Sequence, residues 1–191
     1  MTNKLTSSIG DGGEVISFVN PIKLLPLFSV TEGMQVADFG CGTGYFSILT
    51  AKKVGSSGRV YSIDVQESAL EAVRSRARLE NIFNLQIIRA NLEIPNSTRL
   101  GDNSQDRVYI HNVLFQSNKK DDVLKEAFRV LKNGGKIILI EWFPEKYPSD
   151  RSQVNLFSKM EAKSLLEKNG FAVENDFVAG AYHYGLIAKK P

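Results

Sequence analysis

A run of alternating glycines is the stretch whose residue types and spacing suggest chemistry most directly. The segment VADFGCGTGYF, residues 36–46, leads from an apolar stretch into Gly40, Gly42 and Gly44 and then into a stretch of helix length. Glycine has no Cβ, so backbone amides in such a loop can approach a bound ligand closely. Open α/β sheets bind ligands at the carboxyl ends of their strands. We therefore expect a ligand site where this first strand ends.

The spacing of these glycines narrows the choice of ligand. The dinucleotide-binding fingerprint is G-x-G-x-x-G, but Tyr45 stands where its third glycine belongs and Gly44 comes one residue early. A phosphate-binding P-loop would need Gly-Lys-Ser/Thr after the loop, and the sequence lacks it. The pattern thus disfavours a nicotinamide cofactor and a P-loop nucleotide.

The motif DFGCGTG, residues 38–44, resembles the first motif of the class I S-adenosylmethionine-dependent methyltransferases, whose glycine loop wraps the methionine half of the cofactor. Three later segments are similar to the family's adenine-flanking, fourth-strand and fifth-strand motifs: RANLEIP (89–95), RVYIHNVLFQ (107–116) and LKNGGKIILIEW (131–142). The resemblance spans roughly residues 20–188. Taken together, the motifs are similar to those of small-molecule methyltransferases that include quinone-biosynthesis and arsenite enzymes. Arsenite chemistry needs several cysteines, and Cys41 is the only one in the sequence.

The resemblance implies S-adenosyl-L-methionine as cofactor and assigns residues to it. Asp64 follows Gly44 by 20 residues, at the end of the next predicted strand, where a family acid binds both ribose hydroxyls. Asn91 stands where the family often has an aspartate near adenine, and its amide oxygen can accept a similar hydrogen bond without the charge. The implied cofactor contacts are Asp38, Gly40, Cys41, Gly42, Gly44, Asp64, Val65, Asn91, Leu92 and His111.

Methyl transfer from a sulfonium depends mainly on positioning and exclusion of water, and a general base is needed only when the acceptor must lose a proton. His111, at the end of the fourth predicted strand beside the expected transfer point, is the candidate catalytic residue. Glu141 ends the fifth strand and is interpreted as a loop cap, while His183 is interpreted as structural. Family members often carry a cysteine at the position of Cys41 without using it as a nucleophile.

The elements that must position these residues follow from an alternation of short apolar runs and amphipathic stretches, which is typical of βαβ units. The predicted strands are 34–39, 60–64, 85–89, 107–110 and 136–141, with helices at 43–53, 68–81 and 121–132. The last of these helices is predicted to stop at Asn133-Gly134-Gly135. A helix at 157–168 precedes two runs, 171–178 and 181–188, which are joined by a short glycine-containing turn and predict an antiparallel pair. The fold class is therefore α/β: a doubly wound, mostly parallel seven-stranded sheet with a reversed final strand, a Rossmann-like methyltransferase fold with helices on both faces.

The N-terminal part is predicted to be an extension of one domain. Asn20-Pro21 predicts a helix start, and Pro26 limits that helix to little more than a turn. We interpret 1–28 as a lid or a helix packed on the core, and 29–191 as the methyltransferase domain. Together with residues 111–119 and 142–157, this extension must cover the acceptor site, which predicts a modest cavity.

Composition excludes several classes. With 191 residues, 42% hydrophobic and 24% charged, the chain predicts one globular domain. A net charge of +3 with scattered basic residues gives no nucleic-acid-binding stripe. His111-Asn112 stands where enzymes that methylate amines of DNA bases commonly carry an Asp/Asn-Pro-Pro-aromatic motif. A single cysteine predicts a reducing compartment and no metal site, and we expect no signal peptide or transmembrane segment and a cytoplasmic location.

The motifs and the composition together predict a methyltransferase acting on a small, partly apolar acceptor. Two alternatives stay open: a noncatalytic protein that binds S-adenosylmethionine, and a nicotinamide-dependent oxidoreductase. The acceptor atom and the oligomeric state do not follow from the sequence.

Overall fold

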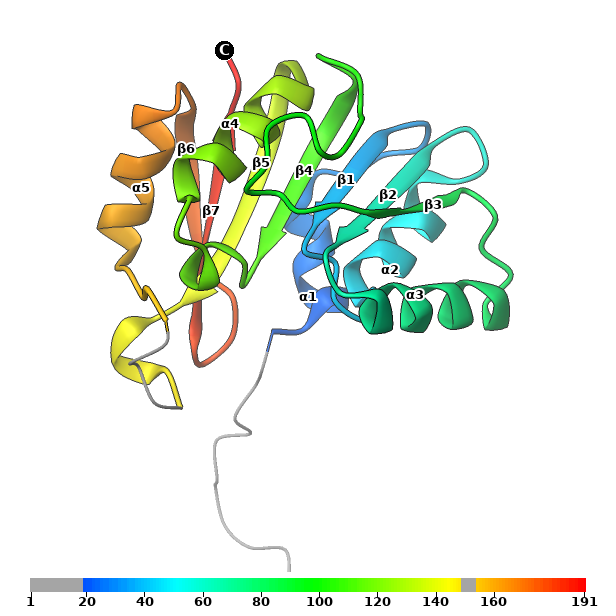
Figure 1. The fold of residues 1–191 in the computed structure, drawn as a ribbon, viewed down its shortest axis with the longest axis horizontal. Helices are drawn as coiled ribbons and strands as arrows, with labels where there is room; N and C mark the ends of the chain where they lie inside the picture. Colours follow the sequence, from blue (N-terminus) through cyan, green and yellow to red (C-terminus); the bar gives the residue numbers. More distant parts are fainter. Residues whose placement is uncertain (1–18, 149–153) are drawn as a thin grey trace, which may run out of the picture.

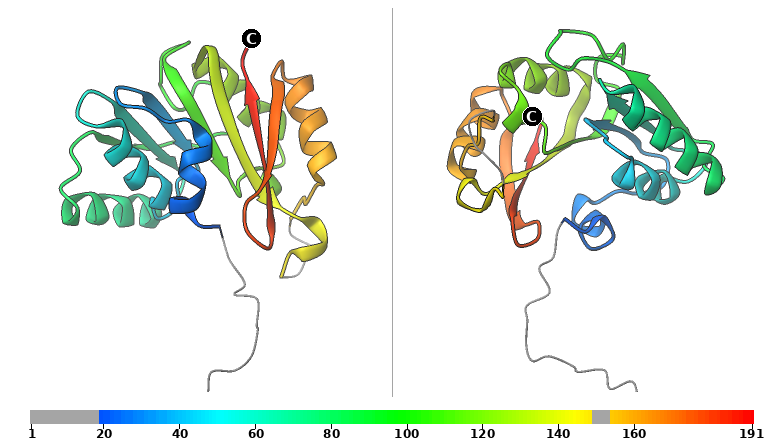
Figure 2. Two further views of the ribbon diagram at one scale, coloured as in Figure 1. Left: turned by 180° about the vertical axis from the view of Figure 1, so that it is seen from behind. Right: turned by 60° about the horizontal axis from the view of Figure 1, so that its bottom comes forward.

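The computed structural model describes residues 19–148 and 154–191, and these form one twisted sheet with helices on both faces (Figures 1 and 2). The strands are β1 (Gln35–Phe39), β2 (Arg59–Asp64), β3 (Leu85–Arg89), β4 (Gln105–His111), β5 (Leu131–Trp142), β6 (Ala172–Val178) and β7 (His183–Lys189). Their order in the sheet is β3-β2-β1-β4-β5-β7-β6.

The first five strands are parallel to one another, and β7 is antiparallel to both β5 and β6. This confirms the predicted seven-stranded sheet with a reversed final strand. The chain order reverses at β1, where β2 lies on one side and β4 on the other. Such a switch point leaves a crevice at the carboxyl ends of the two neighbouring strands, so β1 and β4 define where the site should lie.

The helices α1 (Pro21–Leu24), η1 (Leu25–Phe28), α2 (Tyr45–Val54), α3 (Glu67–Leu79), η2 (Leu114–Gln116), α4 (Lys120–Val130), η3 (Pro144–Lys146) and α5 (Lys159–Lys168) connect these strands. The buried apolar residues form two clusters, each of which contains residues of different helices. One contains α4 and α5 residues such as Leu124 and Leu166, and the other contains α1, η1 and α2 residues such as Leu24, Phe28 and Phe46. Figures 1 and 2 show the two layers.

The short N-terminal helix forms as its sequence predicts. Asn20 Oδ1 accepts hydrogen bonds from the backbone N–H groups of Ile22 and Lys23, and Pro21 is the first helical residue. The helix is fixed to the sheet by Arg107, whose side chain is buried and donates to the carbonyl oxygens of Phe28 at 2.9 Å and Ser29 at 3.0 Å. Residues 19–28 are therefore packed on the core; the rest of the predicted extension, 1–18, lies outside the described residues.

The predicted end of the helix at 121–132 was wrong by two residues. The helix α4 ends at Val130, and Leu131 already belongs to β5, where it pairs with Gln105. The Asn133-Gly134-Gly135 turn does not stop a helix; it lies inside β5, where the pairing with β4 is irregular. Gly134 has φ +79° and donates its N–H to the carbonyl of Lys190, so the turn pairs with the end of the chain.

Candidate active site

The glycine loop joins the end of β1 to α2 and is tied to the end of β2. The backbone N–H groups of Gly40 and Cys41 both donate to the carbonyl oxygen of Ile63, at 2.8 and 3.0 Å. The N–H of Gly44 donates to the carbonyl of Cys41 at 2.9 Å, which closes the turn. These contacts hold the loop against the carboxyl ends of β1 and β2, where the sequence predicted a ligand site.

The surroundings of the three loop glycines differ in whether they leave room for a side chain. A Cβ on Gly40 would lie 2.3 Å from Val113 Cγ2, and one on Gly44 would lie 2.8 Å from Val73 Cγ2. A Cβ on Gly42 would meet no atom within 4 Å. All three have positive φ. Gly40 and Gly44 therefore permit close packing within the protein, and only at Gly42 is the space beside the missing side chain left free.

Asp64 lies at the end of β2 and faces the loop. Its Oδ2 accepts the backbone N–H of Gly42 at 3.0 Å, and its Oδ1 accepts the N–H of Gln66 at 2.9 Å. These bonds fix the direction of the carboxylate. Because each carboxylate oxygen offers more than one lone pair, Asp64 retains the capacity to accept further hydrogen bonds from a ligand.

Two hollows adjoin this loop. The first, called here the Asp64 hollow, has a volume of about 430 Å³ and is lined among others by Asp64, Val65, Leu92 and Val113. The second, the Asp38 hollow, has a volume of about 360 Å³ and is lined by Val19, Pro21, Asp38, Gly40, Cys41, Gly42, Thr43, Tyr45, Phe46, His111, Asn112 and Ile140. Four residues line both: Gly40, Gly42, His111 and Asn112. The hollows thus meet at the glycine loop and at the end of β4.

Asp38 is a buried carboxyl group in the second hollow. Burial raises its pKa to about 7, and the hydrogen bond from Ser47 Oγ to its Oδ2, at 2.6 Å, works in the opposite direction. Asp38 therefore changes charge near neutral pH. Beside it, burial raises the pKa of the Cys41 thiol, so the sulfur stays protonated and is a weak nucleophile.

The predicted adenine-side residues line the Asp64 hollow, with one change of role. Leu92 is buried, whereas Asn91 is exposed. Asn91 Oδ1 accepts the N–H of Glu93 at 3.0 Å, so the oxygen assigned to a ligand also stabilises a local turn. Glu93 in turn accepts the hydroxyl of Ser117 at 2.6 Å, which ties this segment to the turn after β4. Neither Glu93 nor Ser117 was among the predicted site residues.

His111 lies where it was predicted, at the end of β4 between the two hollows. Its ring packs against aromatic rings, with centroid distances of 4.0 Å to Phe46 and 5.5 Å to Tyr109. Burial lowers its pKa to about 3, so the imidazole is neutral at pH 7. A group with so low a pKa is a weak general base, which favours a hydrogen-bonding or packing role.

The remaining polar candidates, Glu141 and His183, contact Asn112 or the residues that follow it. Glu141 is buried, and its Oε1 accepts the N–H groups of Val113 at 3.1 Å and Leu114 at 2.8 Å, so it caps the turn before η2. His183, only 2% exposed, contacts the Asn112 side chain and packs on the Trp142 ring with centroids 3.9 Å apart. Asn112 itself has φ +55° and was not among the predicted site residues, although it follows His111 at the strand end.

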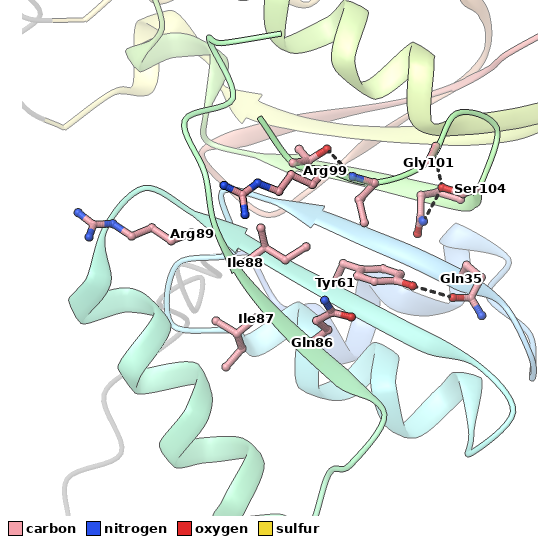
Figure 3. Close-up of a pocket in the computed structure, with 12 residues that line it drawn as sticks. Gln35, Tyr61, Gln86, Ile87, Ile88, Arg89, Arg99, Gly101 and Ser104 are labelled. Atoms are coloured by element: carbon pink, nitrogen blue, oxygen red, sulfur yellow. Dashed lines mark hydrogen bonds between the residues drawn. The ribbon is translucent and has the colours of Figure 1, made fainter. Parts of the chain in front are cut away.

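A larger hollow, of about 690 Å³, lies on the face of the sheet beside β3 and contains none of the predicted site residues (Figure 3). Residues 90–104 follow β3 without forming a helix, and they cross this part of the sheet beside Tyr61 and Ile88. Within residues 19–148 and 154–191, no cluster of histidine, cysteine or acidic side chains could hold a metal ion. No helix in those ranges is long and apolar enough to cross a membrane.

Comparison with known proteins points to one activity. A family model described as a methyltransferase domain matches residues 30–179. The demethylmenaquinone methyltransferase of Listeria welshimeri is 31% identical over 177 residues, which cover 86% of this chain and 73% of that protein. A ubiquinone/menaquinone biosynthesis C-methyltransferase of Haemophilus ducreyi is 34% identical, covering 81% of this chain and 57% of that protein. The crystal structure of a SAM-dependent methyltransferase from Aquifex aeolicus has a TM-score of 0.80 and 27% identity, with 91% of each chain covered.

Proposed function

We propose a reaction from the premise that this chain belongs to the methyltransferase domain family and is an S-adenosylmethionine-dependent methyltransferase. In this reaction the chain methylates a ring carbon of a small quinol-type acceptor. The observation that carries the assignment of the site is the contact between Gly42 and Asp64 at the junction of the two hollows. It joins the residue with free space for a ligand to the carboxylate that can hold a diol.

The residues of the Asp64 hollow suit the adenosine part of the cofactor. Asp64 would accept hydrogen bonds from the ribose hydroxyls, while Val65 and Leu92 offer apolar surface to the adenine and Asn91 offers its amide. Asp38, Gly40 and Cys41 would shape the methionine end, with the main chain at Gly42 closest to it. Gly44 lines neither hollow and would contribute by closing the turn of the loop. Ionised Asp38 attracts positive charge, so it fits a cationic group in the second hollow.

When bound, S-adenosyl-L-methionine supplies an electrophilic methyl group on a sulfonium. The chain then has to place an acceptor carbon in line with that methyl group and exclude water, which are the contributions expected from positioning. His111 lies where the two hollows meet and is neutral at pH 7, so we assign it a neutral contact at the transfer point. Because His111 is too weak a base to take the ring C–H proton that the methyl group replaces, that proton passes to water that enters the site after the transfer.

The methionine end of the cofactor would take the part of the Asp38 hollow beside Asp38 and the glycine loop, and the apolar part of the hollow is the proposed acceptor site. Val19, Pro21, Tyr45, Phe46 and Ile140 give it an apolar wall that suits an aromatic ring. The volume of the Asp38 hollow, about 360 Å³, lies near the lower end of the range of about 300–1,000 Å³ that ligand pockets commonly have. One relative is named as a demethylmenaquinone methyltransferase and another as a C-methyltransferase of ubiquinone/menaquinone biosynthesis. These names favour a quinone-type acceptor over other small aromatic compounds.

Residues 1–28 are proposed to cover this site as an extension of the 29–191 methyltransferase domain. Val19 and Pro21 already form part of the wall of the Asp38 hollow. A cytoplasmic location and the lack of a nucleic-acid partner stay predictions.

The test is methyl transfer by the purified chain to reduced 2-prenyl-1,4-naphthoquinone, with S-adenosylmethionine labelled in the methyl group. We expect a product heavier by one labelled methyl group on a ring carbon, located by mass spectrometry and NMR. Cofactor binding without transfer to this quinol, or to a mixture of other small aromatic acceptors, would instead favour the noncatalytic alternative.

A further inference from the structure

Unpartnered buried polar atoms concentrate at one edge of the sheet. Among the described residues, seven buried side-chain nitrogen or oxygen atoms have no hydrogen-bond partner. Four of these lie at the carboxyl ends of β4 and β5 and at the adjoining start of β7: His111 Nε2, Asn112 Oδ1, Glu141 Oε2 and His183 Nδ1. An unsatisfied buried polar group costs about 1–3 kcal/mol, so such a concentration calls for a functional explanation.

Asn112 is the member of this group that lines both hollows. Its backbone is held in the left-handed region, with φ +55°, and its N–H donates to the carbonyl of Ile140 at 2.9 Å. Asparagine adopts this conformation more readily than most other non-glycine residues, so the residue type suits the turn after β4. The backbone thus fixes the position of the Asn112 side chain, and the contacts of the side chain determine the orientation of its carboxamide.

His183 makes the contact that decides this orientation. Asn112 Nδ2 and His183 Nε2 are 3.1 Å apart, although the residues are separated by 71 positions in the chain. The His183 ring packs on Trp142, which keeps it from rotating. Burial lowers the pKa of His183 to about 4, so the ring is neutral and one nitrogen can accept. With Nε2 accepting from Asn112 Nδ2, the carboxamide oxygen Oδ1 is left for another donor.

We infer that His183 is a positioning residue for the acceptor: it holds the Asn112 carboxamide so that Oδ1 accepts a hydrogen bond from a hydroxyl group of the acceptor. This inference rests on the proposed function, because it takes the acceptor to be a hydroxylated aromatic compound. The hydroxyl group would satisfy the buried oxygen, and an acceptor without a hydroxyl group would leave it unpaired. The Asn112–His183 pair would therefore select for hydroxylated acceptors.

The experiment compares two ligands that differ only in hydroxyl groups. Binding of 2-prenyl-1,4-naphthalenediol and of 2-prenylnaphthalene is measured by calorimetry with the full chain saturated with S-adenosylhomocysteine. The wild type should bind the diol more tightly. His183→Phe keeps a ring on Trp142 but cannot accept from Asn112, so it should weaken binding of the diol about tenfold and leave binding of the hydrocarbon unchanged. His183→Gln, which retains a hydrogen-bonding group, should recover part of the loss.

The outcomes separate this inference from the proposed function. Equal losses for both ligands in His183→Phe, or a wild type that does not distinguish them, would overturn the positioning role. An unchanged affinity of both variants for S-adenosylhomocysteine shows that they fold and bind cofactor. Methyl transfer by the wild type is measured separately with the same diol: its absence rejects the proposed function, whereas transfer with an unaffected His183→Phe variant rejects only the inference.

Discussion

The backbone N–H of Gly42 donates to Asp64 Oδ2 across 3.0 Å, and this bond joins the loop after β1 to the end of β2. One residue of the pair leaves space for a ligand, and the other carries the charge. The relationship means that a change at Asp64 acts in two ways: it removes ligand hydrogen bonds, and it releases the loop that must approach the ligand.

Asp64→Asn should separate these effects. The single amide oxygen can keep the bond from Gly42 and give up the one from Gln66, so the loop stays tied to β2 while the charge that strengthens hydrogen bonds to the ribose hydroxyls is lost. Since hydrogen bonds to charged groups contribute about 1.5–3 kcal/mol, we expect affinity for S-adenosylhomocysteine to fall by about 10- to 100-fold in calorimetry. Asp102→Asn, an exposed carboxylate outside both hollows, is the control and should bind normally. Normal binding by Asp64→Asn would place the ribose elsewhere.

Gly42→Ala and Gly40→Ala should fail in different ways. Both need a positive φ, which costs an alanine about 1–2 kcal/mol. At Gly40 the new methyl group also collides with Val113, so this variant should lose more thermal stability. At Gly42 the methyl group meets only the space kept for ligand, so this variant should lose cofactor affinity beyond its small loss of stability. Thermal unfolding with and without S-adenosylhomocysteine measures both; an equal ligand-induced rise in Tm for Gly42→Ala and wild type would contradict the assignment.

Local sequence patterns are enough to predict the glycine loop and the acid of the candidate site. The glycine spacing and the acid at the end of the next strand lie within 27 residues, 38–64, and both stand at strand ends that the hydrophobic pattern predicts. The parallel order of the first five strands and the antiparallel final pair also follow from local signals. The insertion of β7 between β5 and β6 does not, because it depends on which edge the last strand pairs with.

What sequence reasoning missed are contacts between distant segments. Nothing local to Gly40 or Gly44 shows that they make room for Val113 and Val73. The pairing of Asn112 with His183 and the aromatic packing that keeps His111 neutral likewise arise only when the strands are assembled. The helix end at Val130 was misplaced because Leu131 is buried in either conformation, so its hydrophobicity could not distinguish helix from strand.

Glu141→Gln should change how stability depends on pH. Burial raises the pKa of Glu141 to about 8, well above the value of an unfolded glutamate. Between pH 6.5 and 8 the native state therefore holds a proton that the unfolded state has released, and stability falls as the pH rises. His111 and His183 have lowered pKa values, so their contribution is lost only below pH 6.5.

The measurement is the free energy of unfolding in urea at pH 6.5, 7.2 and 8. Glutamine keeps an oxygen for the N–H groups of Val113 and Leu114 but does not titrate, so the decline should be smaller in the variant. Asp38 adds a decline of the same sign, so the slope should shrink and not vanish. Glu161→Gln, an exposed glutamate whose pKa is lowered by Ser158, is the control and should retain the wild-type slope in this range. An identical slope in Glu141→Gln would show that Glu141 is ionised in the native protein.

Asp38 and Ser47 together should set the pH at which cofactor affinity changes. The pKa of Asp38 lies at about 7 because burial raises it while the Ser47 hydroxyl partly opposes that effect. As the pH rises from 6 to 8 the carboxyl group becomes charged, so its attraction for a cationic ligand increases and binding of S-adenosylmethionine should tighten. Asp38→Asn should abolish this increase. Ser47→Ala removes the hydrogen bond that favours the charged form, so the increase should persist but move to higher pH. His111→Asn should leave the midpoint in place, because His111 is neutral throughout this range. A midpoint that follows the His111 variant, and not the Ser47 variant, would transfer the titration to the histidine and contradict the burial argument for both residues.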